Sequence, residues 1–214
     1  MMRTNDFSLY LITDRHQTCG RTLTEAVHEA LEGGVRAVQL REKDLSGAEL
    51  YRLARDLRRL TSDFDARLII NERPDVALAS GADGVHLGAG SLPVAVVRQL
   101  LGRKMIIGYS AHAVDEALRA EADGADFVTF SPVYPTPSKA AYGAPCGVRK
   151  LADAARALEI PVIALGGISE TNITEALSAD IQGIAVISAI LAAADPRFAA
   201  ASLLEKIEEH AQYP

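Results

Sequence analysis

The length, composition and charge of the chain already limit its class. At 214 residues it can bury one sizeable core, and a single α/β barrel can be built from this length. Hydrophobic residues make up 49% and charged residues 23% of the chain, which excludes a disordered protein. The formal net charge of -6 argues against general nucleic-acid binding, which needs clustered Lys and Arg, but a local group of cations can still hold a small anion.

The hydropathy pattern and the cysteines predict a cytoplasmic protein. No apolar run approaches the ~20 residues that a membrane span needs. The first six residues lack the basic and then apolar plan of a signal peptide. Cys19 and Cys146 are too few for a disulfide framework and have no metal-binding spacing, so we expect free thiols.

The first part of the chain indicates a strand, a helix and a second strand. Residues 8–14 are short, apolar and closed by a polar pair, as in a buried strand. A capping box of Thr22 and Glu25 opens a helix, and the glycines at 33–34 end it. The second apolar run covers residues 35–41.

The same alternation continues to the end of the chain. The further predicted strands are 67–72, 84–88, 105–110, 126–130, 161–165 and 183–187. The further predicted helices are 46–60, a short one ending near 80, 92–101, 114–122, 148–158, 170–178 and 196–211. A long segment, 131–147, carries four prolines and two glycines, and its length favours a functional loop.

Eight apolar strands that alternate with eight helices predict a parallel sheet closed on itself. The predicted fold class is α/β, with a single-domain (β/α)8 TIM barrel over residues 1–214. An open doubly wound sheet is the alternative. Against it, no Gly-x-Gly-x-x-Gly follows the first strand, and a glycine pair follows the seventh strand instead.

An internal repeat supports closure of the sheet. Three stretches align without gaps: residues 34–40, 81–87 and 124–130. Each is a helix end, a turn and a buried strand, as expected of a barrel built from quarter units. The alignment places Gln39, His86 and Thr129 at one level on one face. A single histidine in a strand is more often a hydrogen-bonded core residue than a ligand or base, and both interpretations of His86 stay open.

The end of the second strand carries chemistry. Alternation puts Gln39 and Arg41 on one face, which is the lumen if helices cover the outside of the barrel. Lys43 follows at the carboxyl end, where such barrels carry their active sites. A guanidinium fork and an ammonium together suit a phosphate or diphosphate group. The alternative is a strand that simply ends in solvated charges.

Later segments offer groups for a second anion. Gly166-Gly167 and Ile187-Ser188 follow strands seven and eight, where this fold commonly binds phosphate with backbone amides. A tight turn that needs positive φ is the other explanation of the glycines. Thr136 to Lys139, in the long loop, offers hydroxyls and an ammonium that could close over an anion or lie in solvent.

Taken in this order, the motifs resemble the thiamin phosphate synthase and TenI superfamily over nearly the whole chain. The matching stretches are 10–14, 39–43, 70–71, 84–88, 108–112, 132–139, 163–167 and 186–188. Each match alone is weak, and together they are specific. The resemblance implies small phosphorylated pyrimidine and thiazole substrates and a homodimer.

The resemblance also implies a reaction. Synthases of this family join 4-amino-5-hydroxymethyl-2-methylpyrimidine pyrophosphate to 4-methyl-5-(2-phosphoethyl)thiazole in thiamin biosynthesis and release pyrophosphate. Departure of pyrophosphate leaves a pyrimidinylmethyl cation. The site must therefore stabilise charge on the leaving group and keep water from the cation.

Site residues follow from the resemblance motif by motif. The implied contacts to the pyrimidine pyrophosphate are Gln39, Arg41, Lys43, Asn71, Ser110 and Lys139. The implied contacts to the thiazole phosphate are Thr136, Ser138, Gly167, Ile187 and Ser188. The predicted catalytic residues among them are Arg41, Lys43, Ser110 and Lys139. His86 is a further substrate-binding candidate because it is predicted to face the lumen.

The chain departs from the synthase pattern where Mg²⁺ belongs. The two family aspartates are replaced by Glu72 and Ser91. Glu72 could still hold the ion with its longer side chain, whereas Ser91 supplies no carboxylate. A serine at position 91 resembles the TenI proteins, which include a thiazole tautomerase. However, the histidine that the family uses for that isomerisation is replaced here by Pro132. We predict a synthase that uses Mg²⁺, with a TenI-like isomerase or a non-catalytic thiamin-phosphate-binding regulator as alternatives.

Overall fold

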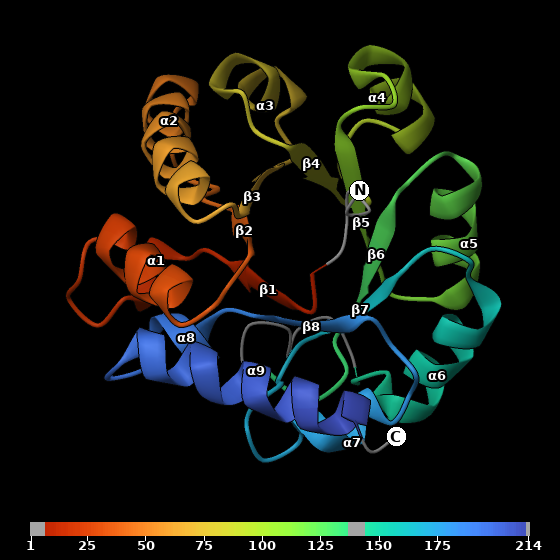
Figure 1. Cartoon of the computed structure of the whole chain (residues 1–214). Coiled ribbons are helices and arrows are strands. Elements are labelled where there is room, and N and C mark those ends of the chain that lie inside the picture. The colour runs from red at the N-terminus through yellow and green to blue at the C-terminus, as the bar shows by residue number, and fades with distance from the viewer. Residues whose placement is uncertain (1–6, 137–143, 213–214) are drawn as a thin grey trace.

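Eight parallel strands pair in chain order and close into a barrel (Figure 1). The computed structural model describes residues 7–136 and 144–212. The strands are β1 Leu9–Ile12, β2 Ala37–Leu40, β3 Arg67–Asn71, β4 Gly84–Leu87, β5 Ile106–Ala111, β6 Phe127–Phe130, β7 Val162–Leu165 and β8 Gly183–Val186. Strand β8 pairs with β1, with Val186 opposite Leu11. The predicted TIM barrel is confirmed, and the open-sheet alternative is wrong.

Helices surround the barrel (Figure 1). They are α1 Leu23–Glu32, α2 Gly47–Asp63, α3 Pro74–Ser80, α4 Val94–Leu101, α5 Val114–Ala122, α6 Gly147–Ala157, α7 Ile173–Leu177, α8 Ser188–Leu191 and α9 Pro196–Gln212, with a 3-10 turn η1 Arg15–Gln17. Helix α8 and turn η1 were not predicted, because segments of three or four residues are too short to show helical periodicity.

The helix starts follow from local sequence. Thr22 accepts a hydrogen bond from the backbone N–H of Glu25, whose carboxylate accepts one from the backbone N–H of Thr22. Ser46 and Glu49 form the same reciprocal pair at the start of α2. Each pair satisfies donors that a helix end leaves unpaired. The predicted capping box at Thr22 is confirmed.

Two apolar layers hold the barrel together. The larger lies between the outward side chains of the strands and the surrounding helices. The smaller fills the lumen and comprises Phe7, Tyr10, Ile12, Ala37, Ile69, Ile106, Phe127, Ile163 and Ala185. Within it, the rings of Phe7 and Phe127 meet edge to face, with centroids 5.4 Å apart. Because Phe7 precedes β1, this aromatic packing closes the amino end of the barrel and leaves polar residues toward the carboxyl end.

The remaining fold-level predictions concern the cysteines, membrane-spanning helices and the end of β2. Cys19 and Cys146 are free thiols, as predicted. Among the described helices, none is long and apolar enough to cross a membrane. Strand β2 ends at Leu40, so Arg41 lies one residue beyond the strand rather than at its last position.

Candidate active site

A buried polar network lies in the lumen beside the aromatic packing. Gln39 Nε2 donates to the hydroxyl of Tyr10 at 3.0 Å, and this hydroxyl lies 3.5 Å from His86 Nδ1. His86 Nε2 lies 3.0 Å from Ser110 Oγ and 3.4 Å from Thr129 Oγ1. The predicted placement of Gln39, His86 and Thr129 at one level is therefore confirmed. The network also brings the predicted site residue Ser110 into the same cluster.

Burial determines the charge of the central histidine. His86 is 2% exposed, and this burial, with the positive charge of Arg41 as a second cause, lowers its pKa to about 3. The imidazole is therefore neutral near pH 7 and forms hydrogen bonds with neighbouring hydroxyl groups. This agrees with the interpretation of His86 as a hydrogen-bonded core residue, and its contact with a substrate stays a prediction.

Two cations stand at the carboxyl end of β2. The backbone N–H of Arg41 donates to Thr13 Oγ1 at 2.9 Å, which ties this end of β2 to that of β1. Among the residues that the structure describes, neither Arg41 nor Lys43 forms an ion pair. Arg41 is close enough to His86 to lower its pKa, so its charge lies near the lumen network. Both charges are available to a bound anion.

The predicted metal position lies between β3 and β4. Asn71 Nδ2 lies 3.3 Å from Glu72 Oε2, and Ser91 Oγ donates to Glu72 Oε1 at 3.3 Å. Within residues 7–136 and 144–212, no group of three or more His, Cys, Asp and Glu side chains is arranged so that it could hold a metal ion. Mg²⁺ is commonly held by one or two carboxylates together with substrate phosphates. One carboxylate beside an amide and a hydroxyl fits an ion bound largely through its substrate.

The backbone conformation of the turn after β7 explains why it contains two glycines. Gly166 has a φ of 101° and Gly167 a φ of 67°, a region that other residues rarely adopt. A Cβ on Gly167 would also lie 2.6 Å from the carbonyl oxygen of Pro135. The backbone N–H of Tyr134 donates to the carbonyl of Gly166 at 3.0 Å. The turn therefore packs against the segment that follows β6, and its phosphate-binding role stays a prediction.

The other predicted phosphate ligands are placed in part. Ile187 precedes the short helix α8, and Ser188 is its first residue and is exposed. Thr136 is half-buried at the last described position of the loop after β6. Ser138 and Lys139 lie outside the described residues.

Several polar residues at the β1 and β2 ends were not predicted. Tyr10 shares the lumen network, and its inward direction follows from strand alternation with Ile12. No role was predicted for Glu42, yet its side chain is 2% exposed and bonded to Arg15. Strand periodicity could have identified Tyr10. No local signal relates Arg15 to a residue 27 positions later.

Comparison with known proteins identifies the family. The family model described as thiamine monophosphate synthase matches residues 9–190 of the chain. The chain belongs to the thiamine monophosphate synthase family.

Family members resemble this chain over almost their full length. A putative thiamine-phosphate synthase of Geobacter sulfurreducens is 61% identical over 199 residues, which cover 93% of each chain. A thiamine-phosphate synthase of Clostridium tetani is 41% identical over 198 residues, covering 92% of this chain and 94% of that protein. The solved structure of a thiamine phosphate pyrophosphorylase from Pyrococcus furiosus superposes with a TM-score of 0.89 at 40% identity, covering 97% of this chain and 98% of that chain.

Proposed function

We propose that the protein is a thiamin phosphate synthase, a transferase that joins hydroxymethylpyrimidine pyrophosphate to thiazole phosphate and releases pyrophosphate. The observation that carries the proposal is the position of Arg41. Its cation stands at the carboxyl end of the barrel without an ion pair among the described residues, beside a buried neutral network. Family membership and the named relatives support the same reaction.

The proposed chemistry begins with departure of the leaving group. The bond between the pyrimidine methylene carbon and the diphosphate oxygen breaks, and its electron pair leaves with the diphosphate. Arg41, Lys43 and Lys139 stabilise the charge that develops on those oxygens. The thiazole nitrogen then donates its lone pair to the methylene carbon, which forms the new bond.

The lumen network is proposed to orient the pyrimidine. Gln39 and Ser110 belong to strands that are fixed on both sides by sheet pairing, and both are held by hydrogen bonds to the buried Tyr10 or His86. Rigid polar groups position a planar ring with little loss of entropy on binding. The aromatic packing of Phe7 and Phe127 closes the far end of the barrel, which supports exclusion of water from the cation.

A magnesium ion is proposed to bind with the diphosphate. Glu72 would provide the carboxylate and Asn71 an amide oxygen, while Ser91 would remain a hydrogen-bond partner of Glu72. When bound, the ion would offset negative charge on the diphosphate oxygens. The thiazole phosphate is proposed to bind at the turns after β7 and β8, through Gly167 and the amides at Ile187 and Ser188.

The direct test is product formation by the purified protein. Incubation with both substrates should give thiamin phosphate and pyrophosphate in equal amounts, with a higher rate when Mg²⁺ is present. An Arg41→Gln variant should lose most of this rate, whereas Arg119→Gln, which removes a cation from an exposed ion pair on α5, should retain it. No product at high protein concentration would contradict the proposal.

A TenI-like isomerase is the second candidate, and Ser91 is the observation that favours it. The Ser91 hydroxyl bonds to Glu72 at a position where a synthase usually carries a second carboxylate. Conversion of the thiazole carboxylate phosphate tautomer, without synthase activity, would support the isomerase. Saturable binding of thiamin phosphate without turnover would support a regulator instead. The homodimer and the cytoplasmic location stay predictions, and sedimentation velocity would test the first.

A further inference from the structure

Charges alternate along the segment that follows β2. Residues 41–44 read Arg, Glu, Lys and Asp, so each cation of the proposed diphosphate site has a carboxylate as its chain neighbour. Successive Cα atoms of a chain are about 3.8 Å apart, so the charges of neighbouring residues can interact within the Debye length, about 8–10 Å at physiological ionic strength. If the two carboxylates paired with Arg41 and Lys43, the attraction of this segment for an anion would largely cancel.

The carboxylates are instead bound by a residue from the loop after β1. The guanidinium of Arg15 donates to both oxygens of Asp44, at 2.5 and 2.6 Å. Its Nη1 also donates to Glu42 Oε2 at 3.1 Å, and its backbone N–H lies 3.2 Å from each Glu42 oxygen. Thr13 Oγ1 donates to Glu42 Oε1 at 2.7 Å. His16 Nε2 lies 3.2 Å from Asp44 Oδ2.

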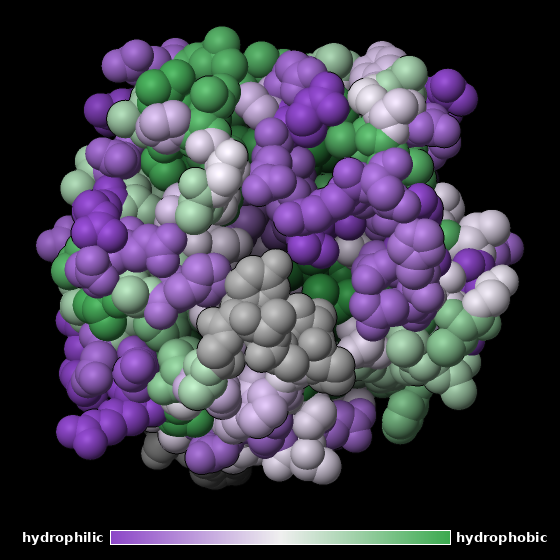
Figure 2. Space-filling model, turned by 180° about the vertical axis from the view of Figure 1, so that it is seen from behind, coloured by the Kyte–Doolittle hydropathy of each residue, from purple (hydrophilic) through white to green (hydrophobic). Residues whose placement is uncertain are grey.

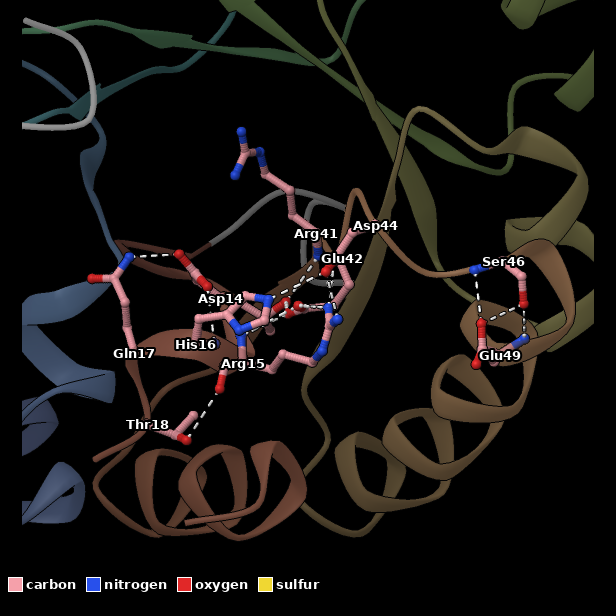
Figure 3. A network of polar contacts seen from close by, with 11 residues as sticks. Asp14, Arg15, His16, Gln17, Thr18, Arg41, Glu42, Asp44, Ser46 and Glu49 are labelled. Atoms are coloured by element: carbon pink, nitrogen blue, oxygen red, sulfur yellow. Dashed lines mark hydrogen bonds and ion pairs between the residues drawn. The ribbon is translucent and has the colours of Figure 1, made fainter. Parts of the chain in front are cut away.

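The two sides of the segment are thereby separated. Figure 3 shows the side chains of Glu42 and Asp44 gathered around Arg15, while the side chain of Arg41 points away from them. Glu42 is 6% exposed, so its negative charge is enclosed with its partners. Arg41 and Lys43 have no carboxylate partner within the described part of the chain.

We propose that Arg15 is a positioning residue that binds Glu42 and Asp44, so that the cations of Arg41 and Lys43 stay available for a diphosphate. The inference rests on the proposed function in one respect, the assignment of Arg41 and Lys43 to the diphosphate. Arg15 touches no substrate in this scheme. It acts by keeping two nearby carboxylates from competing with the anion.

Electrostatics supports the assignment. The hydrogen bonds from Arg15 hold the pKa of Asp44 well below its usual range. Asp44 therefore remains ionised at neutral pH, and its negative charge stays paired with Arg15. Arg is suited to the task because its planar fork contacts two carboxylates at once.

Binding of inorganic pyrophosphate, measured by calorimetry at low salt, tests the proposal without requiring catalysis. Arg15→Gln removes the guanidinium from Asp44 and Glu42, while Glu42 keeps its bonds from Thr13 Oγ1 and the backbone N–H of residue 15. The uncompensated carboxylate charge should raise the dissociation constant by about five- to tenfold, the effect of a unit charge a few ångströms from the anion. Arg119→Gln is the matched control, since it removes a cation from another exposed Arg–Asp pair, and it should leave the constant unchanged.

A second substitution separates charge from loop structure. Arg15→Gln/Asp44→Asn should bind pyrophosphate to within about twofold of the unmodified protein, because one competing charge is removed. A purely structural role for the ion pair predicts no recovery, since both variants lack it. No recovery, or an Arg15→Gln constant equal to that of the control, would overturn the proposal.

The single variant Asp44→Asn keeps the proposal testable even if Arg15→Gln does not fold. It should bind pyrophosphate as tightly as the unmodified protein or more tightly, and weaker binding would overturn the inference. Thiamin phosphate formation is measured separately on the same samples. Absence of product with the expected changes in pyrophosphate binding would contradict the proposed function alone, whereas product formation without those changes would contradict the inference alone.

Discussion

The hydroxyl of Ser91 faces the carboxylate of Glu72. Ser91 Oγ lies 3.3 Å from Glu72 Oε1, so an aspartate here would bring two carboxylates together at the rim. Ser91→Asp should therefore raise Mg²⁺ affinity by about tenfold, through one added charge close to the ion. Ser91→Asn has nearly the same shape without the charge and should leave the affinity low. Equal Mg²⁺ titrations of the two variants would contradict a metal site at Glu72.

The buried imidazole of His86 should make the stability of the fold depend on pH. Its pKa is about 3 in the folded protein against 6.5 ordinarily, so the unfolded chain binds a proton that the folded protein excludes. The resulting stability is fully present above pH 6.5 and is lost as the pH falls toward 3, by up to about 1.4 kcal/mol per pH unit. Urea unfolding between pH 4 and 7 should show a shallower slope for His86→Gln than for the unmodified protein. The exposed His28→Gln should keep the full slope, and an unchanged slope for His86→Gln would contradict the assignment.

Among the secondary-structure elements, strands β4 and β6 begin with the same arrangement of an aspartate and a backbone N–H. Asp83 precedes β4 and accepts a hydrogen bond from the backbone N–H of Leu68 at 2.8 Å, while also pairing with Arg58. Asp126 precedes β6 and accepts from the backbone N–H of Ile107 at 2.7 Å. The two aspartates occupy the same position of the internal repeat. Each one fixes the start of its own strand to that of the preceding strand.

This arrangement predicts a loss of stability without a loss of activity. Asp83→Asn or Asp126→Asn should each lower the free energy of unfolding by about 1–3 kcal/mol, because a charged acceptor of backbone hydrogen bonds is weakened. The rate constant kcat should stay unchanged, since both residues lie at the amino end of the barrel. Urea unfolding and steady-state kinetics check the two halves. Asp115→Asn, in an exposed pair on α5, should cost less than about 0.5 kcal/mol.

The turn after β7 offers a test of contact between elements. Gly167→Ala adds a Cβ 2.6 Å from the Pro135 carbonyl oxygen at a φ of 67°, whereas Gly81→Ala adds one at a φ of 71° with no atom within 4 Å. Both variants carry the cost of a left-handed conformation, about 1 kcal/mol. Only Gly167→Ala should also displace the segment after β6, which we expect to raise KM for thiazole phosphate several-fold. Equal KM values for the two variants would exclude this contact as a determinant of binding.

Periodicity and repetition predicted the elements but not every contact between them. The alignment of three repeats placed Gln39, His86 and Thr129 together because side chains at one level of a closed sheet must meet. Helix α8 was missed because four residues carry no periodic signal. The environment of Glu42 was missed for another reason. It depends on the conformation of the loop after β1, which places Arg15 beside Glu42. The secondary-structure propensities of the two segments do not predict this contact.

On the scale of the whole molecule, the two ends of the barrel have different tasks. Aromatic rings and strand-start aspartates stabilise the amino end, and cations, amides and hydroxyls occupy the carboxyl end. Figure 2 shows the molecule from the side opposite to Figure 1, and hydrophilic residues gather around the middle of the face in view. The net charge of -6 is compatible with the proposed anion site there, because the field of a few close cations outweighs distant, screened carboxylates.

The bonds from Thr13 and Arg15 to Glu42 bear on engineering. These bonds make the loop after β1 and the segment after β2 structurally dependent on each other, although 27 residues separate Arg15 from Glu42 in the chain. Grafting a foreign loop after β1 would leave a charged group enclosed without its donors, at a cost of about 3–5 kcal/mol. Chimeras that exchange both loops together should avoid that penalty, so the natural boundary for recombination falls after the start of α2 rather than between β1 and β2.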